Sequence, residues 1–461
     1  MLFNSYSYLL VFLPVVLAVM AVINKEASLR IPFLVFVSLL FYGFWNPVFV
    51  LLLIGEILVN WVAARLFAAT GNKSAITGAI ILDLAILGTF KYVNFFAANL
   101  AALSGLPLNH HLDLILPLGI SFFTFHHIMY LVDLRRGRAE VTTLDRYALY
   151  ICFFPQAAAG PLARWSEVGR QFGRDAFAPG WEERWALGIT FLIVGLIEKA
   201  ALGDPIGQLV NPIYQAAANA PLHDGSGWLA LGFAFQIFYD FAGYSDMAIG
   251  TALLLGIQLP FNFNAPFRSS SILMFWQRWN MTVSRFLRDY VFIPLSDMRI
   301  AGTRHTIPQY VAAILITMAL CGLWHGAGWN YVLWGTLQGV AIVIALGWRR
   351  VFPPLPKPVG WALTVGFFIL SGVIFRTGNL SVAWNIYSGL GSLPHGKILG
   401  KAWIIGLGAV LAVALPATQD LSRIINWRPR VWVPALLGLI GVALLVQLGG
   451  DQSYEFIYFR F

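Results

Sequence analysis

A single histidine interrupts an otherwise apolar stretch of the chain. His325 lies in the segment ALCGLWHGAGWNYVLWG (residues 319–335), which contains no lysine, arginine, aspartate or glutamate. Imidazole changes its protonation near neutral pH, so this side chain could act as a general acid or base. The alternative is a structural histidine satisfied by hydrogen bonds. The residues leave both interpretations open, because they show neither a Ser-His-Asp order nor a glycine-rich phosphate loop.

Arginines and aromatic residues alternate in the segment FWQRWNMTVSRFLRDYVFIPL (residues 275–295). At about 100° per residue, this spacing predicts one continuous amphipathic helix. Arg278, Arg285 and Arg288 fall on one side of it, where guanidinium groups could bind phosphates through paired hydrogen bonds. The alternative is an interfacial helix whose arginines contact lipid headgroups. The apolar stripe on the other side comprises Trp276, Trp279, Val283, Phe286, Leu287 and Tyr290.

An amide lies at the flank of this stripe, at Asn280. An amide in an apolar setting costs about 1–3 kcal/mol unless it forms hydrogen bonds. The sequence therefore predicts a hydrogen-bond partner for Asn280.

Polar residues also occur in the apolar segment FYDFAGYSDMAIG (residues 238–250), at Asp240, Ser245 and Asp246. Ionisable residues inside a membrane usually face the bundle interior or a water-filled cavity. For both aspartates we favour a structural role, with each one paired to an arginine of residues 256–307. A pore-lining role is the alternative.

Two adjacent histidines, His126 and His127, lie in the segment SFFTFHHIMYLVD (residues 121–133). They are about 100° apart on a helix, so at most one of them is expected to face the interior. A metal-binding pair usually has an i,i+4 spacing. We therefore predict no metal site here.

The composition indicates a membrane protein. Of 461 residues, 59% are hydrophobic and only 11% are charged, whereas soluble domains carry roughly 25% charged residues. Apolar windows of about 20 residues recur, each long enough to cross a hydrocarbon core of about 30 Å. These runs are continuous rather than alternating, which favours helices over barrel strands. The predicted fold class is therefore all-α, a polytopic integral membrane protein.

The net charge of +9 is attributed to cytoplasmic loops rather than to nucleic-acid binding. Basic loops at residues 25–30, 133–138, 349–350 and 423–430 then place both termini outside. Residues 134–184 and 256–307 break the pattern and are interpreted as re-entrant and interfacial segments. The predicted spans, about 11–12 in number, are residues 7–24, 31–50, 49–69, 76–100, 114–133, 185–203, 227–255, 308–324, 329–348, 360–378, 402–419 and 431–449.

Five long motifs occur in a characteristic order. They are LPLGISFFTFHHIMYLVD, FFPQAAAGPLAR, FYDFAGYSDMAIG, PFNFNAPFRSSSILMFWQRWNMTVSRFLRDYVFIPL and LCGLWHGAGWNYVLWG. Together they resemble the membrane-bound O-acyltransferase (MBOAT) family, in its bacterial branch of alginate O-acetyltransferases and D-alanyl-lipoteichoic acid transferases. The terminal FIYFRF also resembles that branch. The resemblance implies one membrane-embedded domain over residues 1–461, with core motifs at about 114–350 and C-terminal helices at 360–449.

The resemblance implies that the histidine of the LWHGA motif is catalytic, and that position is His325. It would lie in a pore where a cytoplasmic acyl donor meets an acceptor from the other face of the membrane. The predicted donor-binding residues are Arg278, Arg285, Arg288 and Trp276. The predicted pore-lining or supporting residues are Asp240, Ser245, Asp246, His126 and Trp324.

One position departs from the branch. Where the branch has a histidine in RWHMSLS, this chain has Asn280. An amide can hold a thioester carbonyl or orient an acceptor hydroxyl, but it cannot transfer the proton. The FFTFQ of relatives reads FFTFH here, so His126 offers a replacement imidazole.

The resemblance implies an integral inner-membrane O-acetyltransferase that modifies an exported or cell-surface polysaccharide. Acetyl-CoA would be the acyl donor, with no bound cofactor and no metal. An extracytoplasmic SGNH-like acetyltransferase would be the partner, and nucleic acid would not be one. Two alternatives stay open: transfer of D-alanyl or another acyl group from a carrier protein to a cell-wall polymer, and a non-catalytic acyl transporter or scaffold.

Overall fold

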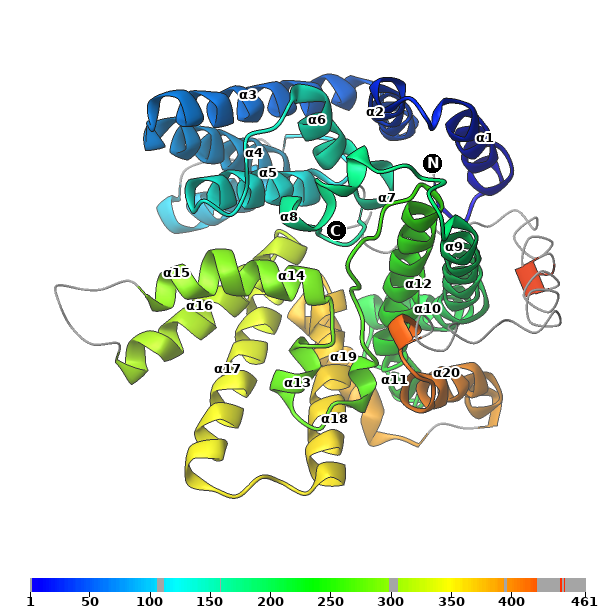
Figure 1. The fold of residues 1–461 in the computed structure, drawn as a ribbon. Helices are drawn as coiled ribbons and strands as arrows, with labels where there is room; N and C mark the ends of the chain where they lie inside the picture. The colour runs from blue at the N-terminus through cyan, green and yellow to red at the C-terminus, as the bar shows by residue number, and fades with distance from the viewer. Residues whose placement is uncertain are drawn as a thin grey trace. The chain divides into compact units, whose positions relative to one another are not determined.

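A computed structural model describes residues 2–105, 112–157, 159–297, 306–393, 396–420, 440–441 and 443. In these residues the chain is built from helices and contains no β-strand (Figure 1). The prediction of an all-α protein is therefore confirmed. The described residues fall into two compact units. The first unit comprises Met1–Ile193 and Tyr244–Pro260. The second unit comprises Val194–Gly243 and Phe261–Leu444.

The first unit begins with a π-helical turn, Ser7–Phe12, which continues into α1 (Leu13–Ile23). A glycine and an asparagine shape its α3–α4 hairpin: Gly71 ends α3 in the left-handed conformation, and the Asn72 side chain caps the first turn of α4 by accepting from the Ser74 amide. The other helices of this unit are α2 (Ala27–Gly43), α3 (Val48–Thr70), α4 (Lys73–Ser104), α5 (Ile120–Arg135), α6 (Leu144–Cys152), α7 (Phe154–Ala157), α8 (Trp165–Val168) and most of α9 (Trp181–Leu196).

The second unit contains the helices that carry most of the predicted site residues. A π-helical segment, Ile197–Gly203, joins α9 to α10. The helix α12 (Phe233–Leu254) begins in this unit and ends in the first. The other helices are α10 (Asp204–Asn219), α11 (Gly227–Ala230), α13 (Ile272–Trp276), α14 (Met281–Phe286), α15 (Ile293–Ser296), α16 (Ile307–His325), α17 (Trp329–Val351), α18 (Lys357–Arg376), α19 (Leu380–Ser388) and α20 (Gly396–Ala414).

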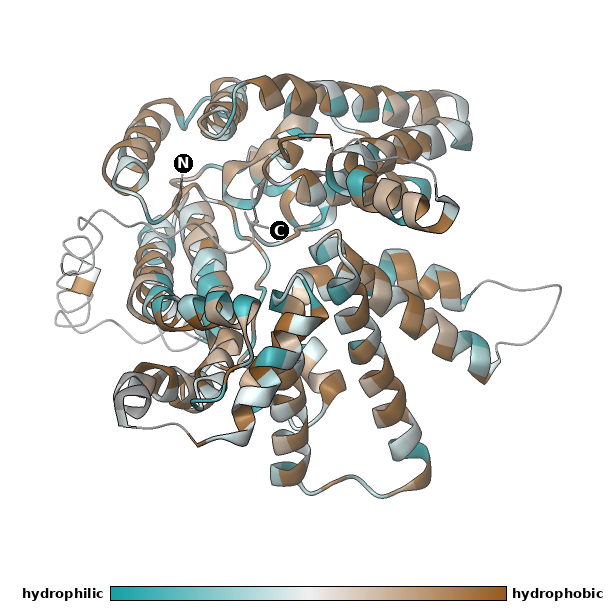
Figure 2. Cartoon of the chain, turned by 180° about the vertical axis from the view of Figure 1, so that it is seen from behind, coloured by the Kyte–Doolittle hydropathy of each residue, from teal (hydrophilic) through white to brown (hydrophobic). Residues whose placement is uncertain are grey.

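Six described helical stretches are long and apolar enough to cross a membrane: Val48–Thr70, Lys73–Ser104, Trp181–Asn219, Ile307–His325, Trp329–Val351 and Lys357–Arg376. Shorter apolar helices occur at Ser7–Ile23, Ser28–Gly43 and Ala402–Ala414. Hydrophobic residues recur along these helices (Figure 2), and many large ones, such as Leu51 and Ile81, are exposed in the manner of lipid-facing side chains. The predicted span 431–449 lies almost entirely outside the described residues.

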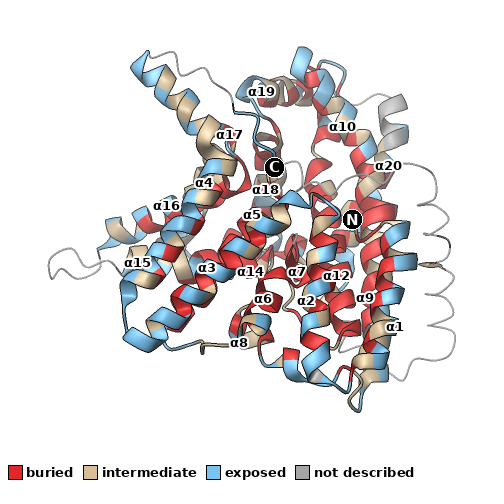
Figure 3. Cartoon of the chain, turned by 90° about the horizontal axis from the view of Figure 1, so that it is seen from above, coloured by how far each residue is buried: buried red, intermediate tan, exposed pale blue. Residues whose placement is uncertain are grey.

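Two predicted spans correspond to inner helices. Nearly every residue of α5 and α12 is buried (Figure 3), including the polar ones. The apolar motif around α6 and α7 is also buried, which confirms that it packs inside the protein. Its re-entrant path stays a prediction.

The α16–α17 hairpin is held by close backbone contact. A Cβ added to Gly335 would overlap the Met318 carbonyl oxygen, and one added to Gly322 would overlap the Tyr331 carbonyl oxygen. Glycine therefore lets the two helices approach more closely than any side chain would allow.

We expect Gly335→Ala to lower the free energy of unfolding by about 1–3 kcal/mol, because the new methyl group overpacks this contact. The control is Gly347→Ala in the same helix, where an added Cβ meets nothing within 4 Å. Alanine is the better helix former, so the control should be neutral or stabilise by up to about 1 kcal/mol. Thermal unfolding of the purified protein in detergent measures both, and equal effects would contradict the close contact.

Candidate active site

His325 is the last residue of α16, and the chain turns immediately after it. Gly326 adopts an extended conformation, and a Cβ there would overlap the Tyr331 ring. The turn ends where α17 begins at Trp329. The hairpin predicted from the sequence is therefore confirmed, and His325 stands at its tip.

Aromatic rings from α16, α17 and α18 surround the imidazole of His325, whose exposed fraction is 5%. The ring centroids of Trp324, Phe375 and Trp334 lie 4.5, 5.0 and 5.4 Å from that of His325. The Asn330 side chain donates to the Phe375 carbonyl oxygen at 3.3 Å and so ties the start of α17 to the end of α18. His325 is thus held in a rigid, largely apolar enclosure.

A cavity of about 380 Å³ lies among α13, α14, α16 and α17. Its charged lining groups are Arg285 and Arg288, and Trp276 forms part of the apolar lining. The Arg288 side chain is 63% exposed and already pairs with the Asp289 carboxylate at 2.7 Å. The cavity therefore combines guanidinium groups with aromatic and aliphatic surface, a mixture suited to a ligand with an anionic end and an apolar end.

A tryptophan connects this cavity to the histidine. The Trp276 ring, which lines the cavity, meets the Trp334 ring at 5.9 Å, and Trp334 in turn packs against His325. Met318 also lines the cavity and lies two turns before His325 on α16, or about 10 Å along the axis. The structure thus brings Trp276, Arg285 and Arg288 to the cavity, with His325 beyond its Trp276–Trp334 side.

The segment 275–295 is not one continuous helix, and that prediction was wrong. The helix α13 ends at Trp276, and α14 starts at Met281 and leads into a π-helical turn, Leu287–Phe292. Between them Asn280 is left-handed, with φ 40° and ψ 55°. Asparagine is one of the few residues that tolerates this conformation. Contacts with the preceding loop hold the break, because the Met281 amide donates to the Asn262 carbonyl oxygen at 2.8 Å.

The break separates the three arginines that were predicted to share a helical face. Arg278 lies in the turn, where its carbonyl oxygen accepts from the Asn264 amide at 2.9 Å, and it does not line the cavity. Arg285 and Arg288 follow the break and do line it.

Asn280 is buried, with an exposed fraction of 3%. Its side chain does not cap α14, and its Oδ1 atom has no hydrogen-bond partner in the described part of the chain. The predicted protein partner for this amide is therefore not found there. A buried acceptor without a partner is costly, so such an atom is a candidate to bind a donor group of a substrate.

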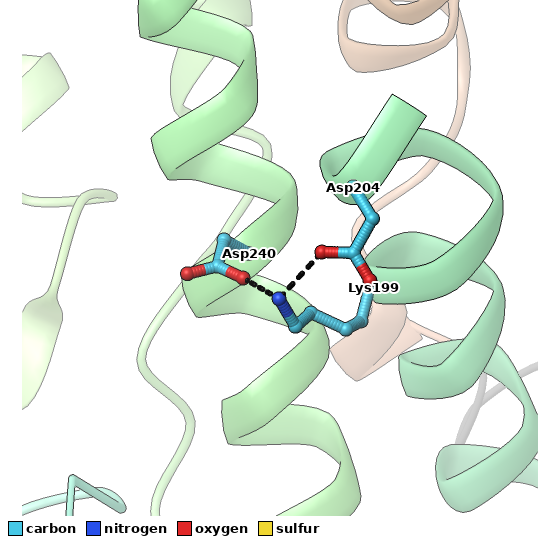
Figure 4. A network of polar contacts seen from close by, with 3 residues as sticks. All are labelled: Lys199, Asp204 and Asp240. Atoms are coloured by element: carbon cyan, nitrogen blue, oxygen red, sulfur yellow. Dashed lines mark hydrogen bonds and ion pairs between the residues drawn. The ribbon is translucent and has the colours of Figure 1, made fainter. Parts of the chain in front are cut away.

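Asp240 pairs with a lysine, which corrects the predicted arginine partner (Figure 4). The Lys199 ammonium lies 2.5 Å from Asp240 Oδ1 and 2.6 Å from Asp204 Oδ1. Lys199 is 3% exposed, so the group joins the π-helical segment Ile197–Gly203 to α10 and α12 inside the protein. Lys199 was not among the residues predicted from the sequence, although a lysine inside an apolar span was the available signal.

The remaining predicted residues, Ser245, Asp246 and His126, are buried in the first unit. His126 Nδ1 donates to the Phe122 carbonyl oxygen at 2.9 Å, and His127 Nδ1 shares a 2.6 Å hydrogen bond with the Tyr147 hydroxyl. Both imidazoles are buried, so the expectation that only one would face the interior was wrong. The role suggested for His126 as a replacement imidazole stays a prediction.

Comparison with known proteins decides the family. The model of the membrane-bound O-acyltransferase family matches residues 122–375, which hold Asn280, His325 and the cavity. The chain belongs to this family. It is an integral membrane O-acyltransferase.

Curated relatives carry acyltransferase names. The probable alginate O-acetylase of Pseudomonas aeruginosa is 34% identical over 92% of this chain and 82% of its own length. The peptidoglycan O-acetyltransferase of Helicobacter pylori is 33% identical over 85% of this chain and 80% of its own. The teichoic acid D-alanyltransferase of Streptococcus thermophilus is 30% identical over 58% of this chain and 69% of its own.

We expect Lys199→Met to lower the free energy of unfolding by about 3–5 kcal/mol, because it leaves two buried carboxylates without their cation. Lys73→Met, at an exposed position of α4, is the matched control and should change the free energy of unfolding by less than about 0.5 kcal/mol. Thermal unfolding in detergent measures the difference. A Lys199 variant as stable as the control would show that the buried group does not hold these helices together.

Proposed function

We propose that this membrane O-acyltransferase transfers acetyl groups from cytoplasmic acetyl-CoA toward an exported or cell-surface polysaccharide. The observation that carries the proposal is the enclosed imidazole of His325 beside a cavity lined by Arg285 and Arg288. The O-acetylase names of relatives that align along most of the chain support acetyl as the group transferred.

His325 acts as the general base in this proposal. It takes the proton of the acceptor hydroxyl as the hydroxyl oxygen attacks the thioester carbonyl. The tetrahedral intermediate then expels the thiolate of coenzyme A, and the imidazolium returns the proton to that sulfur. The position of His325 at the C-terminus of α16 favours the transient imidazolium, because the last carbonyl groups of a helix carry partial negative charge.

Asn280 orients the acceptor. Its buried Oδ1 atom can accept the hydrogen bond of the attacking hydroxyl before His325 removes the proton. The amide holds no proton that it can transfer, so the two residues have different roles.

The donor occupies the cavity. Arg285 and Arg288 bind its phosphates, for which Arg288 exchanges Asp289 for the ligand. Trp276 contacts the apolar part of the donor and directs the thioester toward Trp334 and His325. We do not assign Arg278 to donor binding, because its side chain does not line the cavity.

The acceptor side of this proposal rests on the resemblance to the bacterial branch of the family, and the orientation rests on the charge pattern. An extracytoplasmic SGNH-like acetyltransferase receives the acetyl group and delivers it to the polysaccharide. The protein lies in the bacterial inner membrane with both termini outside, as the basic loops indicate.

Transfer of D-alanyl from a carrier protein is the second candidate, favoured by the D-alanyltransferase relatives that align with a smaller part of the chain. Supplying each donor separately to purified membranes distinguishes the two.

His325→Ala should reduce acetyl transfer by about 10²–10⁴-fold, because general-base assistance is lost. His223→Ala, at an exposed position of the same unit, is the control and should retain activity. Asn280→Ala should reduce acetyl transfer by up to about 10²–10³-fold, because one orienting group is lost. Asn280→His should retain acetyl transfer. The measurement is transfer of labelled acetyl from acetyl-CoA in membranes with matched protein levels. An active His325→Ala protein would remove the imidazole from the mechanism.

Arg285→Gln and Arg288→Gln should raise the apparent KM for the donor and weaken its dependence on salt, because each removes a phosphate contact. Arg278→Gln makes the same substitution at a position that does not line the cavity, so its donor KM should stay close to that of the wild type. Steady-state kinetics at two salt concentrations test this. Equal effects at all three positions would contradict the assignment of the cavity to the donor.

A further inference from the structure

Two carboxyl groups lie on the buried sides of α3 and α4. Glu56 and Asn60 are one turn apart on α3, and Asp83 lies on α4. Glu56 is 3% exposed and Asp83 is 1% exposed. Neighbours on the opposite sides of the helices, such as Leu58 and Ile81, are exposed apolar side chains. The two acids therefore point inward from helices long enough to span the membrane.

Hydrogen bonds draw these side chains into one cluster. Asn60 Nδ2 donates to Asp83 Oδ1 at 2.8 Å and to the Glu56 carbonyl oxygen at 2.9 Å. Glu56 and Asp83 also interact with each other electrostatically. The Asn60 amide thus binds the Asp83 carboxyl group on α4 and the main chain of α3 at Glu56.

Several buried oxygen atoms of this cluster accept no hydrogen bond from the described residues. Both carboxyl oxygens of Glu56, Oδ1 of Asn60 and Oδ2 of Asp83 are buried and have no hydrogen-bond partner among the residues that the structure describes. The hydroxyl group of Tyr42 on α2, which interacts electrostatically with Glu56, is also buried and also lacks a hydrogen-bond partner in the described residues. Buried polar atoms are nearly always satisfied in native proteins, so this set points to a bound species that is positively charged or donates hydrogen.

Within the described residues, no basic side chain compensates these acids. Tyr42 of α2 and Tyr147 of α6 interact with them electrostatically, and Tyr147 shares a hydrogen bond with His127 of α5. Neither Glu56 nor Asp83 forms an ion pair within the described ranges. Two adjacent carboxylates in a low-dielectric interior cannot both stay ionised without a cation.

We propose that Glu56, Asn60, Asp83 and Tyr42 form a binding site for one small, hard cation, either a proton shared by the carboxyl groups or Na⁺. Every candidate ligand atom is an oxygen, and oxygen donors select hard cations. A proton would bind by forming a carboxyl O–H bond and Na⁺ by coordination, and either cation leaves the pair with a single negative charge. The proposed acyl transfer neither takes up nor releases a net proton, so this site is separate from the transfer chemistry. The bound cation halves the negative charge of the carboxylate pair and so stabilises the first unit.

The experiment has two arms, both on the purified full-length protein. Infrared spectroscopy in Na⁺-free choline buffer at neutral pH detects a protonated carboxyl group. Thermal unfolding is then compared in NaCl and choline chloride at equal ionic strength. The variants are Glu56→Gln and Asp83→Asn, and Glu26→Gln is the control because Glu26 is exposed.

A shared proton gives a protonated-carboxyl band in the wild type that shifts in frequency or disappears in Glu56→Gln and in Asp83→Asn and is unchanged in Glu26→Gln. A Na⁺ site gives a higher melting temperature in NaCl than in choline chloride, and this difference disappears in the same two variants. The acids lie on different helices, so either variant suffices if the other does not fold. The absence of both the band and the Na⁺ effect in the wild type would overturn the proposal. Acetyl transfer is not the readout, so failure here would leave the proposed function untouched.

Discussion

Backbone contact between α16 and α17 sets the position of the groups proposed to react. Gly322 and Gly335 allow the two helices to approach so closely that the turn between them is short, and His325 is placed at its tip. The same approach brings Trp334 of α17 against the imidazole. Because Trp334 also meets Trp276, the contact between two glycine-bearing helices determines where the cavity lies relative to the histidine. A side chain at either glycine would shift all of these groups together.

Buried charge is the second constraint, and the two units meet it differently. In the second unit, Lys199 is surrounded by the carboxylates of Asp240 and Asp204, so the ammonium group is fully compensated by the protein itself. In the first unit, the buried acids Glu56 and Asp83 interact electrostatically, Asn60 donates to the Asp83 carboxyl, and no basic side chain pairs with either acid in the described residues. A low-dielectric interior does not tolerate uncompensated charge. The first arrangement is therefore a structural ion cluster, whereas the second calls for a cation from outside.

The left-handed conformation of Asn280 determines which arginines of residues 275–295 line the cavity. If Asn280 were helical, Arg278 would continue the same face as Arg285 and Arg288. The break instead turns Arg278 away from the cavity and buries the amide of Asn280 at the start of α14. The residue expected from the family resemblance to be a histidine is thus also the residue that breaks the helix. Its backbone conformation and its proposed role with the acceptor depend on the same contacts with the loop around Asn262.

The sequence by itself determined the class of the protein, its family and the histidine at the α16–α17 turn. These follow from local composition and from ordered motifs, since a bilayer restricts spanning segments to long apolar helices. Tertiary structure alone decided that Lys199 is the partner of Asp240, that the helix breaks at Asn280 and that His126 and His127 are both buried. The reason is physical. Periodicity describes the faces of one helix, whereas ion pairing, burial on every side and a left-handed turn depend on neighbours that are distant in the sequence.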